Sequence, residues 1–142
     1  MFSKACEYAI RAVVCIAACG EGKHMNLKAV AKETAIPEAF TAKVLQQLVH
    51  AELVLSTKGP GGATPCFGGL AHEVKLSPSF PPIDGDAIHK GCALGLPHCD
   101  AARPCACDHF LKVREDLRRM LERTSVQDLV KDMKEGGAVL KR

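Results

Sequence analysis

Four of the eight cysteines in this 142-residue chain lie in one short stretch, CALGLPHCDAARPCACDH, which runs from Cys92 to His109. Glycines and prolines are interleaved among them, so the stretch is predicted to be a loop and not a helix. Thiolates are soft ligands that suit zinc or iron–sulfur clusters, and a loop closes around a metal centre at little cost in chain entropy. These residue types predict a metal or cluster site.

The gaps between the cysteines favour one kind of centre. Six residues separate Cys92 from Cys99, five separate Cys99 from Cys105, and one separates Cys105 from Cys107. Paired zinc ligands are usually about two to four residues apart. The spacing therefore favours an iron–sulfur cluster over zinc, and a disulfide-bonded or merely cysteine-rich surface loop is the remaining alternative.

The composition favours one helical domain with an aliphatic core. At 142 residues the chain is long enough to bury such a core without disulfide bonds. Aromatic residues make up only 4% and tryptophan is absent, which disfavours a sandwich or barrel rich in aromatic strands. The net charge of +3 permits nucleic-acid binding without requiring it.

The apolar run from Ala12 to Cys19 resembles a short lipoprotein signal, but we reject that interpretation. Glu7 and Arg11 interrupt the apolar region, and the run falls far short of the roughly 20 residues that span a membrane. We therefore expect a cytoplasmic protein whose cysteines are reduced. The cysteines of this region are expected to pack as small hydrophobic residues: Cys6, Cys15 and Cys19.

A helix from Ser3 to Ala18 is predicted first, followed by a pair of shorter helices between Asn26 and His50. Ser3 and Asn26 are suitable N-caps, and Pro37 fits the first turn of the last helix. This spacing is typical of a helix-turn-helix. Apolar residues at three- and four-residue steps are expected to hold the pair together: Leu27, Val30, Ala31, Ile36, Phe40, Val44, Leu45, Leu48 and Val49.

The opposite face of the last of these helices carries small or hydrogen-bonding residues, which can approach base edges in a DNA major groove. They are Glu38, Ala39, Thr41, Ala42, Lys43 and Gln46. Two short amphipathic helices are more often plain core, so this pattern alone is a weak signal.

A predicted β-hairpin strengthens the DNA-binding interpretation. Leu53–Thr57 is strand-like, Lys58–Gly62 suits a tight turn, and Glu73–Leu76 is predicted as a short return strand. Helix, turn, helix and hairpin together form a winged helix. Lys58 can enter a minor groove beside glycines that let the backbone approach a phosphate, although a solvated surface lysine is the alternative.

Residues 108–135 predict a long amphipathic helix, with Asp108 as its N-cap, and a shorter helical piece from Val126 to Met133. The apolar stripe of the long helix has no partner helix reserved for it, so we expect it to be buried against its copy in a homodimer. Packing back onto its own domain is the alternative. The stripe consists of Phe110, Val113, Leu117, Met120 and Leu121.

Several segments follow one another in the order known from a family of regulators. They are EYAIRAV, NLKAVAKETAIPEAFTAKVLQQLVHAELVLS, STKGPGG, IDGDA at 83–87, the three spaced cysteines, and VREDLRRMLERTSVQDL. Through them nearly the whole chain resembles the IscR/NsrR family of bacterial winged-helix iron–sulfur transcription regulators. The resemblance implies a homodimeric regulator, such as a repressor, that binds a palindromic double-stranded DNA operator. It also implies a [2Fe-2S] or [4Fe-4S] cluster whose state or presence alters DNA affinity.

The resemblance implies a fold that is mainly α with a small β-hairpin wing. Its parts would be a winged helix-turn-helix DNA-binding domain at 1–80, a cluster-binding loop at 81–107, and a dimerisation helix and tail at 108–142. The residues expected to contact the operator are Lys28, Pro37, Ala39, Thr41, Lys43, Lys58, Gly61 and Gly62.

The cluster ligands implied by the resemblance are Cys92, Cys99 and Cys105, which leave one coordination position to fill. Cys107 is the strongest ligand chemically but lies close to Cys105, whereas His109 is better spaced. In some relatives the remaining ligand is an acidic residue near the start of the partner chain's first helix. Glu7 matches that position, although an acid there is also favoured by the helix dipole. His98 is a further candidate.

The chain departs from the family pattern in several places. GPGGATPCFGGLAHE replaces a continuing strand, and Pro65 and Cys66 fit a strand badly. Prolines in SPSFPP, at 77–82, preclude the regular helix expected there. Glu52 replaces a glycine that would provide a left-handed cap, and Asp108 replaces a frequent histidine ligand.

Two other function classes remain open. One is a thiol or iron–sulfur electron-transfer or redox protein that uses the same cysteines, and the other is a structural-zinc DNA-binding module. An enzyme is not expected, because the sequence has no general-base constellation, and GPGG lacks the lysine and serine or threonine that follow in a nucleotide-binding loop.

Overall fold

The structure is a computed structural model, and it describes residues 3–20, 22–59, 62–68, 72–76, 108–137 and 139–140. Three helices come first, then a two-stranded hairpin, then two further helices. The predicted metal-binding loop at 81–107, with its four cysteines and His98, lies outside the described residues, as do the segment at 77–82 and Gly61.

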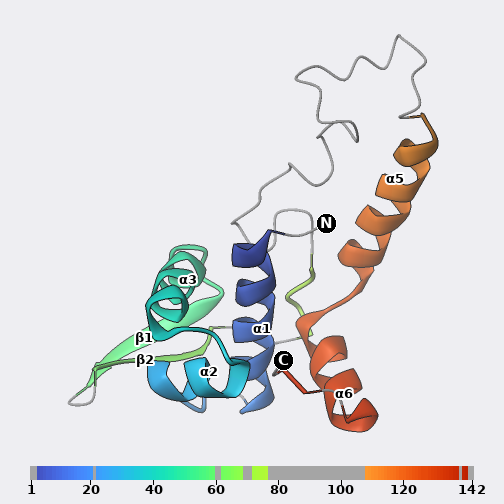
Figure 1. The fold of residues 1–142 in the computed structure, drawn as a ribbon. Coiled ribbons are helices and arrows are strands. Elements are labelled where there is room, and N and C mark those ends of the chain that lie inside the picture. The colour runs from blue at the N-terminus through green and yellow to red at the C-terminus, as the bar shows by residue number, and fades with distance from the viewer. Residues whose placement is uncertain are drawn as a thin grey trace.

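Helix α1 (Lys4–Ala18) lies at the centre of the described chain, and α2, α3, β2 and α6 pack on it (Figure 1). Its buried face is made of small and branched apolar residues, including Ala9, Ala12, Val13 and Ile16, all fully shielded from solvent. The predicted N-cap is confirmed, because the Ser3 hydroxyl accepts a hydrogen bond from the Cys6 amide at 3.1 Å. This cap satisfies one of the free amides at the start of the helix.

The predicted helix pair is confirmed as α2 (Leu27–Thr34) and α3 (Glu38–His50). The Asn26 side chain accepts from the Ala29 amide at 2.7 Å and so caps α2. Ala35 then adopts the left-handed conformation, with φ at +51°, and the Ile36 amide donates to the Ala31 carbonyl at 3.1 Å. This tight reversal ends α2 and turns the chain into α3.

The wing consists of β1 (Val54–Gly59) and β2 (Gly62–Phe67), which pair antiparallel with Val54 opposite Phe67 and Gly59 opposite Gly62. The prediction that Pro65 and Cys66 would not fit a strand is wrong. The Pro65 carbonyl accepts from the Met25 amide on the outer edge of the hairpin, at 3.0 Å. Because a strand residue points its nitrogen and its carbonyl to the same side, the missing N–H of Pro65 removes no bond to β1.

The prediction that Glu73–Leu76 is the return strand of the wing is also wrong. This segment runs instead beside the junction of α5 (Asp108–Arg123) and α6 (Val126–Gly136). The Leu76 amide donates to the Thr124 carbonyl and the Val126 amide donates to the Val74 carbonyl, both at 2.9 Å. The extended segment thus forms its backbone hydrogen bonds with the α5–α6 junction, which is distant in sequence.

Helix α6 begins with a capping box, in which the Asp128 amide donates to the Ser125 hydroxyl at 3.1 Å and the Ser125 amide donates to the Asp128 carboxylate at 2.8 Å. Val126 and Val130 then enter the core beside α1. Among the described helices, none combines the length and the apolar character needed to cross a bilayer.

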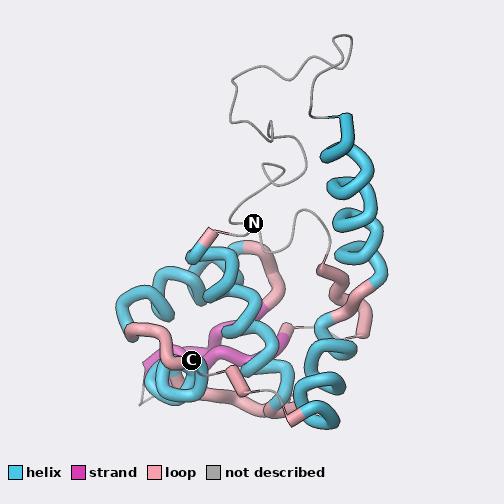
Figure 2. The backbone as a smooth tube through the Cα atoms, turned by 45° about the vertical axis from the view of Figure 1, so that its right-hand side comes forward, coloured by secondary structure: helices cyan, strands magenta, loops and turns pink. Residues whose placement is uncertain are grey.

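Helix α5 projects away from the other described elements in both views (Figures 1 and 2). Its first-turn residue Phe110 and its mid-helix Val113 are half or more exposed, whereas Leu117 packs partly against the core. Leu121 is only 4% exposed and belongs to the core of its own chain. The expectation that Leu121 serves a dimer contact is therefore wrong, because the base of α5 is already covered.

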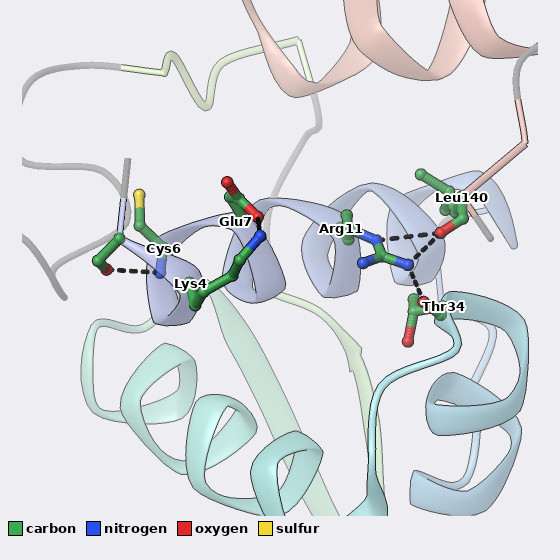
Figure 3. Close-up of polar contacts among 7 residues, drawn as sticks. Lys4, Cys6, Glu7, Arg11, Thr34 and Leu140 are labelled. Atoms are coloured by element: carbon green, nitrogen blue, oxygen red, sulfur yellow. Dashed lines mark hydrogen bonds and ion pairs between the residues drawn. The ribbon is translucent and has the colours of Figure 1, made fainter. Parts of the chain in front are cut away.

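Arg11 joins three segments that are distant in sequence (Figure 3). Its Nε donates to the Leu140 carbonyl at 3.0 Å, and its Nη2 donates to the carbonyls of Thr34 and Leu140. Thr34 is the last residue of α2, where backbone carbonyls lack a partner within the helix. A single guanidinium thus ties α1 to the end of α2 and to the chain after α6.

Candidate nucleic-acid interface

Helix α3 presents a polar and small face to solvent beside the wing. Val44, Leu45 and Leu48 are buried and pack its inner side into the core. Because successive helical residues are about 100° apart, the opposite side must face outward. The exposed residues of α3 that were predicted for this face are Glu38, Ala39, Lys43 and Gln46.

Thr41 does not belong to that face, contrary to the prediction. It is fully buried, and its hydroxyl donates to the Pro37 carbonyl at 3.1 Å. A hydroxyl that bonds to the carbonyl four residues back is satisfied without water, so a polar residue can be buried there. Thr41 therefore supports the first turn of α3 and leaves the set of candidate DNA contacts.

Phe40 is exposed, whereas the sequence predicted it to be part of the core. It was predicted to pack between the helices, yet it is 57% exposed. Its ring meets that of Tyr8 edge to face, with 6.2 Å between the ring centroids and 60° between the planes. Phe40 thus contacts α1 from the first turn of the recognition helix.

An open groove runs between the second half of α3 and the base of the wing. Its polar lining offers amide, imidazole, ammonium and hydroxyl groups, which can donate to phosphates or base edges, and the carboxylate of Glu52, which cannot. The residues around it include Ala42, Lys43, Gln46, Gln47, Val49, His50, Glu52, Ser56 and Pro65.

The wing is stiffened by contacts between polar side chains at its middle. The hydroxyls of Thr57 and Thr64 lie 2.9 Å apart across the two strands, and His24 Nδ1 lies 3.4 Å from the Thr57 hydroxyl. Lys58 stands beyond them in β1, opposite Ala63. Such cross-strand pairs stabilise an isolated hairpin and hold its far end at a fixed distance from α3.

The other predicted DNA contacts come from the start of α2, the start of α3 and the wing. Lys28 is exposed in the first turn of α2, and Pro37 is exposed at the N-cap of α3, one position before the predicted first turn. Gly62 begins β2, whereas Gly61 lies outside the described residues. Of the predicted contacts in the described part of the chain, Lys43 lines the groove, whereas Thr41 is buried and excluded from it.

Glu52 ends α3 in the left-handed conformation, with φ at +58°. The family resemblance places a glycine there, and its absence put this cap in doubt. The cap is nevertheless present, because the Leu53 amide donates to the Leu48 carbonyl at 3.0 Å. A side chain in this conformation costs about 1 kcal/mol.

Glu7 lies near the start of α1, with its carboxylate on the side away from α3 (Figure 3). It pairs with Lys4 at 2.8 Å, and the two side chains are 40% and 66% exposed. His109 falls in the first turn of α5, while Cys92, Cys99, Cys105 and Cys107 lie outside the described residues. Within the described ranges no three His, Cys, Asp or Glu residues gather to hold a metal ion.

Arg11 and Tyr8 are structural links that the sequence analysis missed. Both fall in EYAIRAV, a segment noted only as a family motif. The signal for Arg11 is a cation within a largely apolar helix, which needs buried partners if it is not to remain in water. Nothing in the periodicity of the chain indicates that those partners are Thr34 and Leu140.

Comparisons with known proteins agree with this architecture. The chain is 24% identical over 131 residues to the HTH-type transcriptional regulator NsrR of Oceanobacillus iheyensis, covering 91% of this chain and 88% of that protein. The structure of CymR, the global cysteine regulator of B. subtilis, superposes with a TM-score of 0.76 at 17% identity, covering 92% of this chain and 96% of the other. T. potens IscR superposes with a TM-score of 0.73 at 18% identity, covering 98% and 92%.

The family comparison covers almost all of the chain. The model of the Rrf2 family, described as iron-dependent transcriptional regulators, matches residues 2–132. That range includes the helix pair, the wing, the cysteine-rich segment, α5 and the first half of α6. The chain therefore belongs to the Rrf2 family of transcriptional regulators.

Proposed function

We propose that this protein is a homodimeric regulator that binds a palindromic DNA operator and whose affinity is controlled by an iron–sulfur cluster. The observation that carries the DNA-binding part is the exposed face of α3 beside the groove and the wing. A helix of this kind enters the major groove, and a wing reaches the adjacent minor groove or backbone. Such a regulator would work in the cytoplasm and would not be an enzyme.

The exposed residues suggest distinct roles at the operator. Lys28 and Lys43 would contact phosphates, because an ammonium group is a point charge that attracts them without reading sequence. Gln46 would read a base edge, for which an amide is suited. Ala39 is small enough to let α3 approach the bases closely, and Pro37, Lys58, Gly61 and Gly62 would contact the backbone at the edges of the interface.

The dimer would form through α5. Four large apolar side chains of this helix stay about half exposed or more within the chain: Phe110, Leu111, Val113 and Met120. When two copies pair, exposed apolar area of this kind is removed from water, which is a favourable change. A dimer with twofold symmetry at the α5 contact would present its two α3 helices to the two halves of a palindrome.

The ligands of the cluster would be Cys92, Cys99 and Cys105, with Glu7 of the other copy, His109 or Cys107 completing the set. Glu7 fits this role, because it is partly exposed and its ion pair with Lys4 lies at the surface and is worth at most about 1 kcal/mol. A carboxylate is also a weaker and more exchangeable ligand than a thiolate. When bound, the cluster supplies the redox and ligand-exchange chemistry of the sensor.

Glu7 is well placed to influence α3. It precedes Tyr8, whose ring touches Phe40 in the first turn of the recognition helix. If Glu7 gains or loses a partner, the start of α1 shifts, and the Tyr8–Phe40 contact carries that shift toward the DNA-binding face. Cys6, buried beside Glu7, limits the movement to small displacements.

The DNA-binding part is tested by salt-dependent affinity. An operator is first selected from random duplexes with the purified protein, and affinity is then measured by fluorescence anisotropy over a range of salt concentrations. Lys28→Ala and Lys43→Ala should weaken binding and lower the salt slope by about 2 each, because each substitution removes one lysine from both copies in the dimer. Lys131→Ala, on α6 and across α1 from α3 (Figure 1), is the control and should change neither. An unchanged affinity and slope in both variants of the interface would show that this docking is wrong.

The cluster is tested by anaerobic purification, an absorption spectrum, and iron and sulfide analysis. Cys92→Ala, Cys99→Ala and Cys105→Ala should each abolish the cluster, whereas the control Cys66→Ala should retain it. Glu7→Ala or His109→Ala should leave a cluster bound with an altered spectrum and altered control of DNA affinity. If Cys107→Ala also loses the cluster, the site is an all-cysteine site. If the purified protein is colourless and contains zinc, it is a structural-zinc module and not an iron–sulfur sensor.

A further inference from the structure

Two cysteines at the end of α1 and a methionine from the segment that follows it bring sulfur-bearing side chains to one end of this helix. Cys15 and Cys19 are four residues apart, so they share one side of the helix. Met25 comes from the segment that leads into α2. Cys15 Sγ lies 3.7 Å from Met25 Sδ, and Cys19 Sγ lies 3.5 Å from the Cys15 carbonyl oxygen. Both cysteines are free thiols.

We propose that Cys15, Cys19 and Met25 form a binding site for a soft monovalent metal ion, copper(I). Thiolates and thioethers select copper(I) over harder ions. Two sulfur ligands at about 2.3 Å from one ion lie about 3.8 to 4.0 Å apart. The distance of 3.7 Å between Cys15 Sγ and Met25 Sδ already approaches that separation.

The donor set distinguishes copper(I) from zinc. A structural zinc site takes four ligands from cysteine, histidine or carboxylates. No third residue of those types joins Cys15 and Cys19 in the described part of the chain. Copper(I) is satisfied by two or three sulfur ligands, and Cys15, Cys19 and Met25 offer three.

The sulfur groups are accessible from one side. Cys15 is 5% exposed, whereas Cys19 and Met25 are partly exposed, so an ion can enter from the solvent side. Burial, with smaller effects from Cys19 and Glu33, raises the pKa of Cys15 to about 11. At neutral pH this group is therefore a thiol. On binding, each cysteine releases its proton to water and supplies an electron pair to the metal–sulfur bond, Met25 supplies a lone pair, and the copper remains in the +1 state.

The site also borders the base of the wing. The Met25 amide donates to the Pro65 carbonyl of β2 at 3.0 Å. A metal ion held by Met25 and α1 would therefore fix the segment that supports both α2 and the wing.

The test is an anaerobic titration of the reduced, metal-free full chain with copper(I) in competition with the chelator bicinchoninate. Thiolates elsewhere in the chain are also soft ligands that can take up copper(I), so the measured quantity is the difference between variants. Cys19→Ala should bind one equivalent less than the unmodified chain. Met25→Leu conserves side-chain volume and should weaken that equivalent at least about tenfold, the loss that removal of even an outer-shell partner causes.

Cys66→Ala is the matched control, because Cys66 is a buried free cysteine of β2 and is not one of the three proposed copper ligands. It should bind the same number of copper ions as the unmodified chain. Circular dichroism confirms that each variant is folded. The site is refuted if Cys19→Ala and Met25→Leu both match the unmodified chain. An effect of Cys19→Ala without any effect of Met25→Leu also overturns the three-sulfur site.

Discussion

Tyr8 and Phe40 meet edge to face, with 6.2 Å between their ring centroids, and so join the first half of α1 to the first turn of the recognition helix. Phe40 remains 57% exposed in this contact. The pair therefore serves less to fill the core than to hold α3 at a defined angle to α1.

A double-mutant cycle should detect this contact. Tyr8→Ala and Phe40→Ala are expected to show a coupling of about 0.5 to 1.5 kcal/mol, the range for aromatic pairs of this geometry. Urea unfolding of the two single variants and the double variant gives the value. The pair Tyr8→Ala and Val113→Ala is the control and should be additive, because the projecting part of α5 shares no aromatic contact with Tyr8. Full additivity of Tyr8 and Phe40 would contradict the contact.

Replacing Glu52 with glycine should stabilise the protein. Glu52 adopts φ of +58°, which is strained for any residue with a Cβ. After the greater unfolded-state entropy of glycine is subtracted, we expect a gain of about 0.5 to 1 kcal/mol in the free energy of unfolding. Thermal and urea unfolding measure it. Glu52→Ala removes the carboxylate but keeps the Cβ, so a gain of equal size in that variant would show that charge, and not backbone strain, is responsible.

A charge placed on the exposed part of α5 should separate the proposed dimer without unfolding the chain. Val113 is 62% exposed, so Val113→Glu should give a folded monomer by light scattering at micromolar concentration. Leu121→Glu, at a position only 4% exposed, should instead unfold the protein. The exposed Lys112→Glu on the same helix is the control for charge alone. A dimer that survives Val113→Glu would place the interface elsewhere.

The capping box of α6 should make stability depend on acid. Hydrogen bonds from the Ser125 hydroxyl and amide hold the pKa of Asp128 below its usual value of 3.8. Because this pKa is lower in the folded chain than in the unfolded chain, the stabilisation is complete above the unfolded value and is lost as the pH falls through the folded value. The difference in Tm between the unmodified protein and Asp128→Asn should therefore be constant from about pH 7 to 5 and shrink below about pH 4.

Asp132→Asn provides the comparison for that experiment, because it removes an exposed acid from the same helix without touching the capping box. Its Tm difference from the unmodified protein should not show the same decline. The measurement should extend to about pH 2.5, which is well below the usual pKa of an aspartate. If the Tm difference for Asp128→Asn stays constant to that pH, the capping hydrogen bonds do not hold the carboxylate in solution.

Local features of the fold were predictable from the sequence. Ser3 and Asn26 cap their helices as expected, since a cap depends on a side chain and an amide only three residues away. The two helices of the helix-turn-helix and the position of β1 follow from equally local patterns. The family resemblance extended these pieces to the whole winged helix, and the observed elements and the similar solved structures confirm that fold.

Features decided by contacts between distant residues were not predictable. The exchange of Phe40 and Thr41 is a rotation of one residue around α3, and periodicity cannot decide it, because Thr41 can satisfy its hydroxyl within the helix. The second wing strand was misplaced because Pro65 is acceptable only on an outer edge, which the pairing with Met25 provides. The ligand role of the loop cysteines remains a prediction that spectroscopy of the purified protein must test.

The bonds from Arg11 to Thr34 and Leu140 have a consequence for protein synthesis. The carbonyl of Leu140 completes the partners of Arg11 on α1, a helix that emerges from the ribosome well before residue 140. Val126 and Val130 of α6 fill the core beside the same helix at a similarly late stage. Domains ordinarily fold as units as the chain emerges. Because Val126, Val130 and Leu140 follow α2, α3 and the wing in sequence, the core that supports those elements is completed only after residue 140 has left the ribosome.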